Sequence, residues 1–295
     1  MSNQPPGGES STNASQIIIP EDRIIVVMGP TGAGKSNFID VATKQDGHTV
    51  GHKLESETSD IRAVRVDHPI TGNSVVLVDT PGFDDSSKSD VEILTMIAGW
   101  LVKTYKGHFN LATIVYLHRI IDNRMSGSLQ KNLLLFKSLC GQEAMPNVVI
   151  ATTMWRRVWG TEGEDREARL KSAYWADMMT QGCRVERFRD TYDSAWFIID
   201  GRFEEPAMVR VSREMVDRRL QLKQTQAGIT LNNELKKLVK ARKEAARKLQ
   251  AQLKQQDNDL VVQQLRKTQT EIDEKIVQLN ELKLSFMAQL LAFFK

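Results

Sequence analysis

The chain has 295 residues, of which 41% are hydrophobic, and a formal net charge of +3. This content is enough for a buried core, but the longest apolar runs fall far short of the 18 or more residues that a membrane-spanning helix needs. Two cysteines, Cys140 and Cys183, are too few for a disulfide framework and lack metal-ligand spacing. These features exclude disulfide-rich secreted and membrane-spanning classes, and they favour an intracellular, cytoplasmic protein.

The N-terminal segment MSNQPPGGESSTNASQ is polar and rich in Pro, Gly and Ser. It has no apolar stretch typical of a signal peptide, so we expect residues 1–20 to form a disordered tail. The charge is divided unevenly along the chain. Residues 1–205 hold 22 Lys and Arg against 27 Asp and Glu, whereas residues 206–295 hold 18 against 10. The acidic and basic parts therefore indicate two regions with different tasks.

Apolar strand-like runs alternate with helical segments over the first two thirds of the chain. Short β-branched runs predict buried strands, and apolar residues at three- and four-residue steps predict helices. In chain order the sequence predicts a strand at 24–28, a helix at about 35–44, strands at 61–69 and 74–80, a helix at 88–105, a strand at 111–117, a helix at 128–140, a strand at 147–153, a helix at about 163–181, a strand at 183–188 and a helix from Ser194. This order is typical of a doubly wound α/β sheet, mostly parallel and six-stranded, with its ligand at the carboxyl ends of the strands.

Beyond Pro206 the chain holds no further proline, and Leu, Lys, Gln, Glu and Arg dominate. Apolar residues recur at helical spacing over 231–290, which predicts either one long amphipathic helix or a helical hairpin. The polar run QQDND at 255–259 is a suitable bend between two antiparallel arms. We therefore expect an α/β domain over 21–205 and a helical or coiled-coil extension over 206–295.

Residues 26–38, VVMGPTGAGKSNF, join an apolar strand to a glycine-rich turn with the spacing G-x-x-x-x-G-K-S of a phosphate-binding loop. Glycines open backbone conformations closed to other residues and leave the N–H groups accessible. These groups and the positive end of the next helix attract an anion. The loop residues expected to contact a nucleotide are Gly29, Thr31, Gly32, Ala33, Gly34, Lys35, Ser36 and Asn37.

The chemistry expected at this loop follows from its last residues and from a second motif. Lys35 reaches terminal phosphates, and the Ser36 hydroxyl binds Mg²⁺. The motif DTPG follows about 45 residues later at the end of a predicted strand. In it, Asp79 can hold a water molecule of the Mg²⁺ ion, and the Gly82 N–H can contact a γ-phosphate.

Two segments near these motifs are the expected switches, 48–60 and 82–90. In the first, Thr58 is preferred over Thr49 and Ser56 as a Mg²⁺ ligand, because it immediately precedes the next strand. An ordinary solvated loop is the alternative for this stretch. The residues expected to serve catalysis are Lys35, Thr58 and Gly82, and those expected to serve the metal are Ser36, Thr58 and Asp79.

The motifs GPTGAGKS, DTPGFDD, YLHRIIDNRMSGS, LCG, ATTMW and DSAW follow one another in this order. Over about 22–203 the chain thereby resembles the G domains of fungal relatives of septins, chloroplast-import receptor GTPases and immunity-associated GTPases. The resemblance implies a guanine-nucleotide switch that uses GTP or GDP with Mg²⁺. It also implies a homodimer through the nucleotide face, the coiled coil or both.

The residues after the fifth predicted strand depart from the pattern of GTPases, which place there an Asp that accepts two hydrogen bonds from guanine. This chain has TMWR at 153–156, and the arginine at the last position cannot accept them. Trp155 or Arg156 could stack on the base, and a Trp155 without base contact is the alternative. The residues expected at the base are Thr153, Trp155, Ser194 and Ala195, and selectivity for GTP over ATP is left open.

Phe83 follows Gly82, where fast GTPases place a glutamine that orients water, so we expect slow hydrolysis. Arg119 and Arg124 are candidates for a role across a dimer, with structural ion pairs as the alternative. The sequence thus predicts a slow GTPase with a coiled-coil arm. The alternatives are a nucleotide-stabilised coiled-coil scaffold with negligible turnover and a non-selective or ATP-using P-loop NTPase.

Two stretches of the C-terminal extension, 236–248 and 286–294, are candidate surfaces for binding a partner or a membrane. Residues 236–248, KKLVKARKEAARK, hold seven Lys and Arg. Such a run is usually the solvated face of a helix, and it also suits an acidic partner or an anionic membrane surface. It has no interleaved aromatic residues, which argues against nucleic acid. The apolar stretch 286–294 is expected to be buried by the chain, another subunit or a membrane interface. Peripheral association with a membrane is therefore one expected location of the protein.

Overall fold

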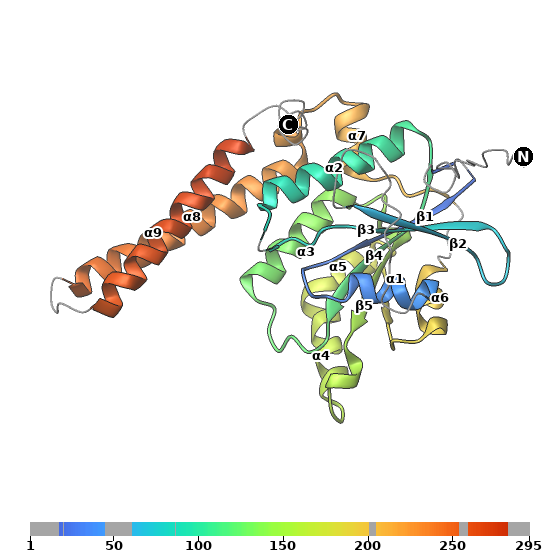
Figure 1. Cartoon of the computed structure of the whole chain (residues 1–295), viewed down its shortest axis with the longest axis horizontal. Helices are drawn as coiled ribbons and strands as arrows, with labels where there is room; N and C mark the ends of the chain where they lie inside the picture. The colour runs from blue at the N-terminus through green and yellow to red at the C-terminus, as the bar shows by residue number, and fades with distance from the viewer. Residues whose placement is uncertain are drawn as a thin grey trace, which may run out of the picture.

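The computed structural model describes residues 18–19, 21–44, 61–85, 87–200, 205–253 and 259–282. Within them, a sheet is flanked by helices on both faces, and two long helices project from one side (Figure 1). Most of the expected tail, the switch stretch 48–60 with Thr58, residues 255–258 of the expected bend and the apolar stretch 286–294 lie outside the described residues.

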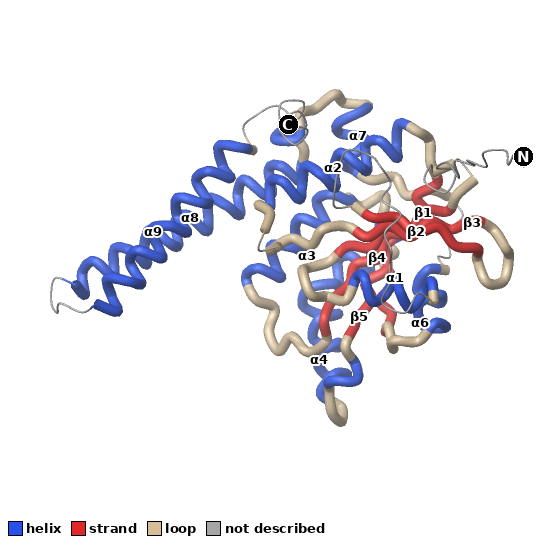
Figure 2. The backbone as a smooth tube through the Cα atoms, viewed as in Figure 1, coloured by secondary structure: helices blue, strands red, loops and turns tan. Residues whose placement is uncertain are grey.

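The sheet has six strands in the order β2-β3-β1-β4-β5-β6. Their bounds are β1 (Arg23–Met28), β2 (Arg62–Asp67), β3 (Ser74–Asp79), β4 (Asn110–Arg119), β5 (Val148–Thr153) and β6 (Arg184–Arg187). β2 runs antiparallel to β3, with Arg62 opposite Asp79, and all other neighbouring strands are parallel. Figure 2 shows the strands in red with helices around them. The predicted six-stranded, mostly parallel sheet with one hairpin is confirmed.

Nine α-helices are present in the described residues. They are α1 (Lys35–Thr43), α2 (Asp90–Lys106), α3 (Gly127–Cys140), α4 (Glu162–Leu170), α5 (Ala176–Thr180), α6 (Tyr192–Ile199), α7 (Arg210–Val216), α8 (Gln226–Leu253) and α9 (Asp259–Glu281). Successive strand side chains point to opposite faces of the sheet. Ile25 and Val27 of β1 accordingly pack with α1 and α6, whereas Ile24 and Val26 pack with α2 and α3.

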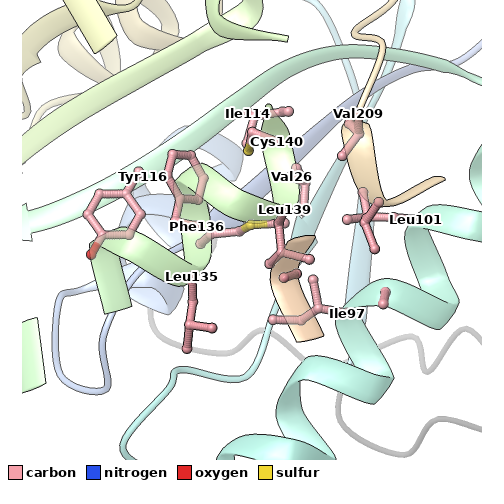
Figure 3. Packing of buried hydrophobic residues seen from close by; sticks show 14 of the residues in the cluster. Val26, Ile97, Leu101, Ile114, Tyr116, Leu135, Phe136, Leu139, Cys140 and Val209 are labelled. Carbon is pink, nitrogen blue, oxygen red and sulfur yellow. The ribbon is translucent and has the colours of Figure 1, made fainter. Parts of the chain in front are cut away.

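The larger core lies between the sheet and α2 and α3, and the chain before α7 also enters it (Figure 3). Figure 3 labels Val26, Ile97, Leu101, Ile114, Tyr116, Leu135, Phe136, Leu139, Cys140 and Val209. Helix α2 begins with a capping box, in which Ser89 and Glu92 each accept a hydrogen bond from the other's backbone N–H. This core therefore fixes α2 and α3 against the strands that carry the phosphate loop and the DTPG motif.

Two predicted helices differ in detail from the structure. The helix expected at 163–181 is divided into α4 and α5 by a π-helical stretch, Lys171–Trp175. The extra residue of a π-helical turn changes the direction of the side chains that follow, and the Trp175 ring lies fully buried, 5.3 Å from the His118 ring. The helix expected from Ser194 begins at Tyr192, because Thr191 caps it.

The C-terminal region is a helical hairpin in which α8 and α9 lie side by side (Figure 1). None of the described helices is both long and apolar enough to cross a membrane. The base of the hairpin belongs to the larger core, since Leu231, Leu235 and Leu282 are buried there. Ser138 of α3 and Thr230 of α8 also share a hydrogen bond of 2.8 Å. The hairpin therefore packs on α2 and α3. The boundary between two domains after residue 205 stays a prediction.

Candidate functional site

The glycine-rich loop joins β1 to α1 at the carboxyl end of the sheet. Gly29 and Gly34 have φ angles of +144° and +94°, which other residues rarely adopt. A Cβ at Gly29 would lie 2.6 Å from the Leu117 carbonyl oxygen, so the backbone of β4 leaves no room for a side chain. The sequence therefore needs glycine here both for conformation and for close approach of β4.

Main-chain N–H groups line this loop. Among the described residues, the amides of Gly32 and Gly34 have no hydrogen-bond partner. The first N–H groups of α1 have no intrahelical acceptor either, as at the start of any helix, and no side chain caps α1. Open amides at the positive end of a helix form an anion site, so this geometry suits a phosphate group.

Lys35 lies within the loop and turns back on it. Its Nζ donates hydrogen bonds to the carbonyl oxygens of Gly29, at 3.2 Å, and Pro30, at 3.3 Å. Burial lowers the pKa of Lys35 below its ordinary value, while the charges of Asp79 and Asp85 act in the opposite direction. The ammonium is thus desolvated and only partly compensated, and a bound phosphate would supply the missing negative charge.

Ser36 and Asp79 meet across the loop, although 43 residues separate them in the chain. The Ser36 Oγ donates to Asp79 Oδ2 at 2.8 Å, while the buried Asp79 Oδ1 has no partner within the described part of the chain. Burial raises the pKa of Asp79, although the hydrogen bond from Ser36 and the charge of Lys35 oppose this. A hydroxyl beside an unpartnered carboxylate oxygen suits Mg²⁺, which prefers oxygen ligands. The two predicted metal residues therefore lie together, and their chemistry fits the ion.

The DTPG segment lies directly on the phosphate loop. The Thr31 N–H donates to the Phe83 carbonyl at 3.4 Å, and the Thr31 hydroxyl donates to the Gly82 carbonyl at 3.3 Å. A Cβ at Gly82 would lie only 2.6 Å from Thr31 N and 2.9 Å from Lys35 Nζ. Gly82 thus lies beside Lys35, and no side chain would fit between them.

The residues predicted at the base serve structural contacts. The Thr153 hydroxyl donates to the Ala33 carbonyl at 3.0 Å and so supports the phosphate loop. The Trp155 Nε1 donates to the Thr152 carbonyl at 3.1 Å, and the Arg187 guanidinium lies 4.3 Å from the centre of the Trp155 ring. Arg187 covers one face of this ring, which is therefore not available to a base.

Ser194 and Ala195 differ from the expected loop, because both lie in the first turn of α6. The Ser194 N–H donates to the Thr191 hydroxyl at 3.3 Å, and the Ala195 N–H donates to the Thr191 carbonyl at 3.0 Å. Ala195 is also fully buried. The N–H groups of Ser194 and Ala195, which were expected to contact the base, are thus bonded to Thr191 at the start of α6.

The structure places one further residue at this edge of the sheet. Asp190 precedes the α6 cap with a φ of +55°, and its Oδ1 accepts a hydrogen bond of 3.1 Å from Asn37 of α1. Asp190 therefore joins the loop after β6 to the helix that follows the phosphate loop. The sequence signal was an acidic residue just past the carboxyl end of a predicted strand, where α/β proteins bind ligands.

Arg119 and Arg124 have different surroundings. The Arg119 Nε pairs with Asp122 Oδ2 at 3.0 Å, which is the structural ion pair left open by the sequence. Its NH1 atom would lie 3.4 Å from a Cβ at Gly32, so the guanidinium also borders the phosphate loop. Arg124 is exposed and, within the described chain, has no partner.

The chain was compared with protein families, curated proteins and solved structures. Residues 24–151 match a family described as 50S ribosome-binding GTPase. A structure of Toc33 from Arabidopsis thaliana with Mg²⁺ and GMPPNP is 18% identical, with a TM-score of 0.44 over 58% of this chain and 72% of that chain. A structure concerning the chloroplast translocon components atToc33 and psToc159, in which dimerization is important for GTPase activity, is 17% identical, with a TM-score of 0.39 over 57% and 69%.

The FeoB G-domain from Methanococcus jannaschii is 12% identical, with a TM-score of 0.36 over 61% of this chain and 93% of that chain. A search of curated proteins found no match. The sequence resemblance to P-loop GTPases is confirmed by the family match. Together, the six-stranded sheet, the glycine-rich loop and that match identify residues 24–151 as part of a P-loop GTPase domain.

Proposed function

We propose that the chain is a guanine-nucleotide switch that binds GTP or GDP with Mg²⁺ and hydrolyses GTP slowly. One observation carries the proposal: open loop amides, the Lys35 ammonium and the Ser36–Asp79 pair converge at the carboxyl end of the sheet. This is the arrangement that a nucleotide polyphosphate and its metal ion require.

Each group has a role in the proposed site. The amides of the loop hold the phosphates, and Lys35 leaves its carbonyl partners to contact the terminal ones. Ser36 and Asp79 hold Mg²⁺ directly or through water, with Thr58 as a further ligand. The ion would neutralise charge on the phosphate oxygens. The Gly82 N–H contacts the γ-phosphate.

Slow hydrolysis follows from the residue after Gly82. Phe83 is buried in the larger core, and its ring cannot orient a water molecule. An arginine supplied by a second subunit can raise GTPase rates by about 10³–10⁵-fold. The exposed Arg124 suits that role in a homodimer formed through the nucleotide face.

We assign selectivity for guanine to Asp190, because position 156, where GTPases usually place the Asp that binds the base, is an arginine in this chain. Guanine presents two N–H donors on one edge, at N1 and the 2-amino group, whereas adenine presents an acceptor at N1 and no amino group at position 2. Within the described residues, the Asp190 carboxylate accepts a hydrogen bond from Asn37 through Oδ1 and none through Oδ2, so Oδ2 can accept from the base. Arg156 is exposed and has no acceptor to offer.

The hairpin is proposed to couple nucleotide state to self-association or to a partner. Its base contacts both helices that follow the motifs: Ser138 meets Thr230, and the Ser89 Oγ lies 3.5 Å from the Glu281 carboxylate. Four exposed basic residues follow one another at helical spacing along α8: Lys236, Lys240, Lys243 and Arg247. Within the described chain, no ion pair or side-chain hydrogen bond engages them. This stripe suits an acidic partner or the anionic surface of a membrane, with the protein in the cytoplasm.

Calorimetric titration of purified protein with GTP, GDP and ATP, each with Mg²⁺, tests the proposal. We expect binding of GTP and GDP, weaker binding of ATP, and none in a Lys35→Ala variant. Equal affinity for GTP and ATP would defeat the guanine assignment, and absence of any binding would defeat the site.

A nucleotide-stabilised scaffold is the second candidate, favoured by the buried Phe83 beside Gly82. Phosphate release separates the two candidates. A wild-type rate equal to that of Lys35→Ala supports the scaffold, and a higher wild-type rate supports the GTPase.

A further inference from the structure

The DTPG segment lies directly against the part of the phosphate loop that carries Thr31 and Lys35. Gly82 lies so close to Thr31 and Lys35 that even a methyl group would come within 2.6 Å of the Thr31 nitrogen. A phosphoryl group is much larger than a methyl group, so it can reach Lys35 from this side only after residues 82–83 move. In the proposed site, the last phosphate of a diphosphate would lie on the open amides of Gly32 and Gly34 and would require no such movement.

Asp84 holds this segment in place. Its φ of +64° is rare for a residue other than glycine. Both carboxylate oxygens are held by α3: Oδ1 accepts from Lys131 Nζ at 2.6 Å, and Oδ2 accepts from Asn132 Nδ2 at 3.1 Å. Because Asp84 is two residues after Gly82, these bonds restrain the part of the chain that covers the phosphate loop.

Lys131 is the centre of the cluster and is only 5% exposed. Its Nζ also donates to Oδ2 of the buried Asp90, the first residue of α2, at 2.8 Å. Burial alone would lower the pKa of Lys131, but Asp90 and Asp84 together raise it above its ordinary value. Lys131 is therefore charged, and it ties the end of the DTPG segment to both α2 and α3.

We propose that Asp84 and Lys131 form a latch that sets the preference of the site between nucleoside diphosphate and triphosphate. The inference rests on the proposed function and names positioning residues for it, since both act through Gly82 and touch no phosphate. With the latch closed, the site accepts the diphosphate. Triphosphate binding must displace residues 82–83 against the bonds that Asp84 makes to α3.

The main test is Asp84→Asn. Asparagine tolerates the left-handed conformation and keeps the size of the side chain, while the Lys131–Asp90 pair remains. Affinities for GDP and for a non-hydrolysable GTP analogue, both with Mg²⁺, are measured by calorimetry. We expect the ratio of analogue affinity to GDP affinity to rise about tenfold, the size of one weakened hydrogen bond to a charged group. We expect GDP affinity itself to change less than twofold.

A matched control exists on the same helix. Lys137 of α3 pairs with Asp177 at 2.7 Å, and within the described chain neither side chain bonds to the phosphate loop. Asp177→Asn removes the same charge from a lysine pair and is expected to leave the affinity ratio unchanged. Lys131→Met is a second latch variant, with its fold checked by thermal melting, and the ratio should move in the same direction.

The outcomes separate the latch from the proposed function. A ratio for Asp84→Asn within twofold of the wild-type ratio, or one that shifts toward the diphosphate, refutes the latch while the nucleotide site stands. A similar rise in the Asp177→Asn control also refutes it. If wild-type protein binds neither nucleotide, the proposed function fails and the latch fails with it.

Discussion

Gly82→Ala tests the contact between the DTPG segment and the phosphate loop most directly. The backbone at Gly82 is not in the left-handed region, so alanine introduces no conformational strain. Its methyl group would lie 2.6 Å from Thr31 N, 2.7 Å from Thr31 Oγ1 and 2.9 Å from Lys35 Nζ. Only the lysine end can move away easily, because the Thr31 nitrogen belongs to the loop backbone.

The magnitude follows from the overlap. Ordinary van der Waals contact begins at 3.4 Å, so the segment and the loop must separate by about 0.8 Å at Thr31. Overpacking of this kind costs about 1–3 kcal/mol. For a protein of this size, about 2 kcal/mol corresponds to a fall in Tm of roughly 4–8 °C. GTP hydrolysis should also fall about tenfold, because the Gly82 N–H is displaced from the γ-phosphate.

The assay is thermal unfolding of nucleotide-free protein, followed by circular dichroism, together with single-turnover phosphate release. Gly127→Ala is the control, because a Cβ there meets nothing within 4 Å and the residue lies in the first turn of α3. That variant should keep its Tm or gain about 0.5–1 kcal/mol of stability. A Gly82→Ala protein that melts with the control and hydrolyses GTP at the wild-type rate would refute the close contact.

Three further predictions concern other parts of the site. Asp79→Asn should raise the Tm of the nucleotide-free protein at pH 7 and weaken Mg²⁺-dependent binding. The pKa of Asp79 is raised in the folded state, so its ionisation destabilises the fold once the pH exceeds the ordinary value of 3.8, and this loss of stability is complete above the folded pKa. The stabilisation by Asp79→Asn should therefore vanish below that ordinary value, and a Tm unchanged at pH 7 would contradict it. Trp155→Phe should lose about 1 kcal/mol of stability with the hydrogen bonds to Thr152, and nucleotide affinity in titrations should stay within twofold, unlike that of a base-stacking residue. Asp190→Ala should lower GTP affinity about tenfold and leave ATP affinity unchanged in a competition assay; an equal loss for both nucleotides would count against the base contact.

Much of the fold and part of the site follow from local sequence. The strands begin and end within about two residues of the predicted positions, because short β-branched runs between turn residues favour buried strands. The phosphate loop is contiguous, and its glycines determine its backbone conformation. The pairing of Ser36 with Asp79 was also predictable, because adjacent parallel strands bring their carboxyl ends to the same edge.

The sequence left open whether residues 231–290 form one helix or two, and the periodicity of the apolar residues is the same for both. It also left open the role of Trp155, whose ring can be placed only once the positions of Thr152 and Arg187 are known. The division of 163–181 by a π-helical turn depends on the core position of Trp175. Helical spacing does not report such packing.

By itself, the sequence determined the strands, the phosphate loop and the motif that follows it, because each depends on conformational preferences of neighbouring residues. Only the tertiary structure decided that Asp84 meets Lys131, at a separation of 47 residues, and that Asn37 meets Asp190, at a separation of 153. Such pairs depend on how whole helices and strands pack around the sheet. No local preference encodes that geometry.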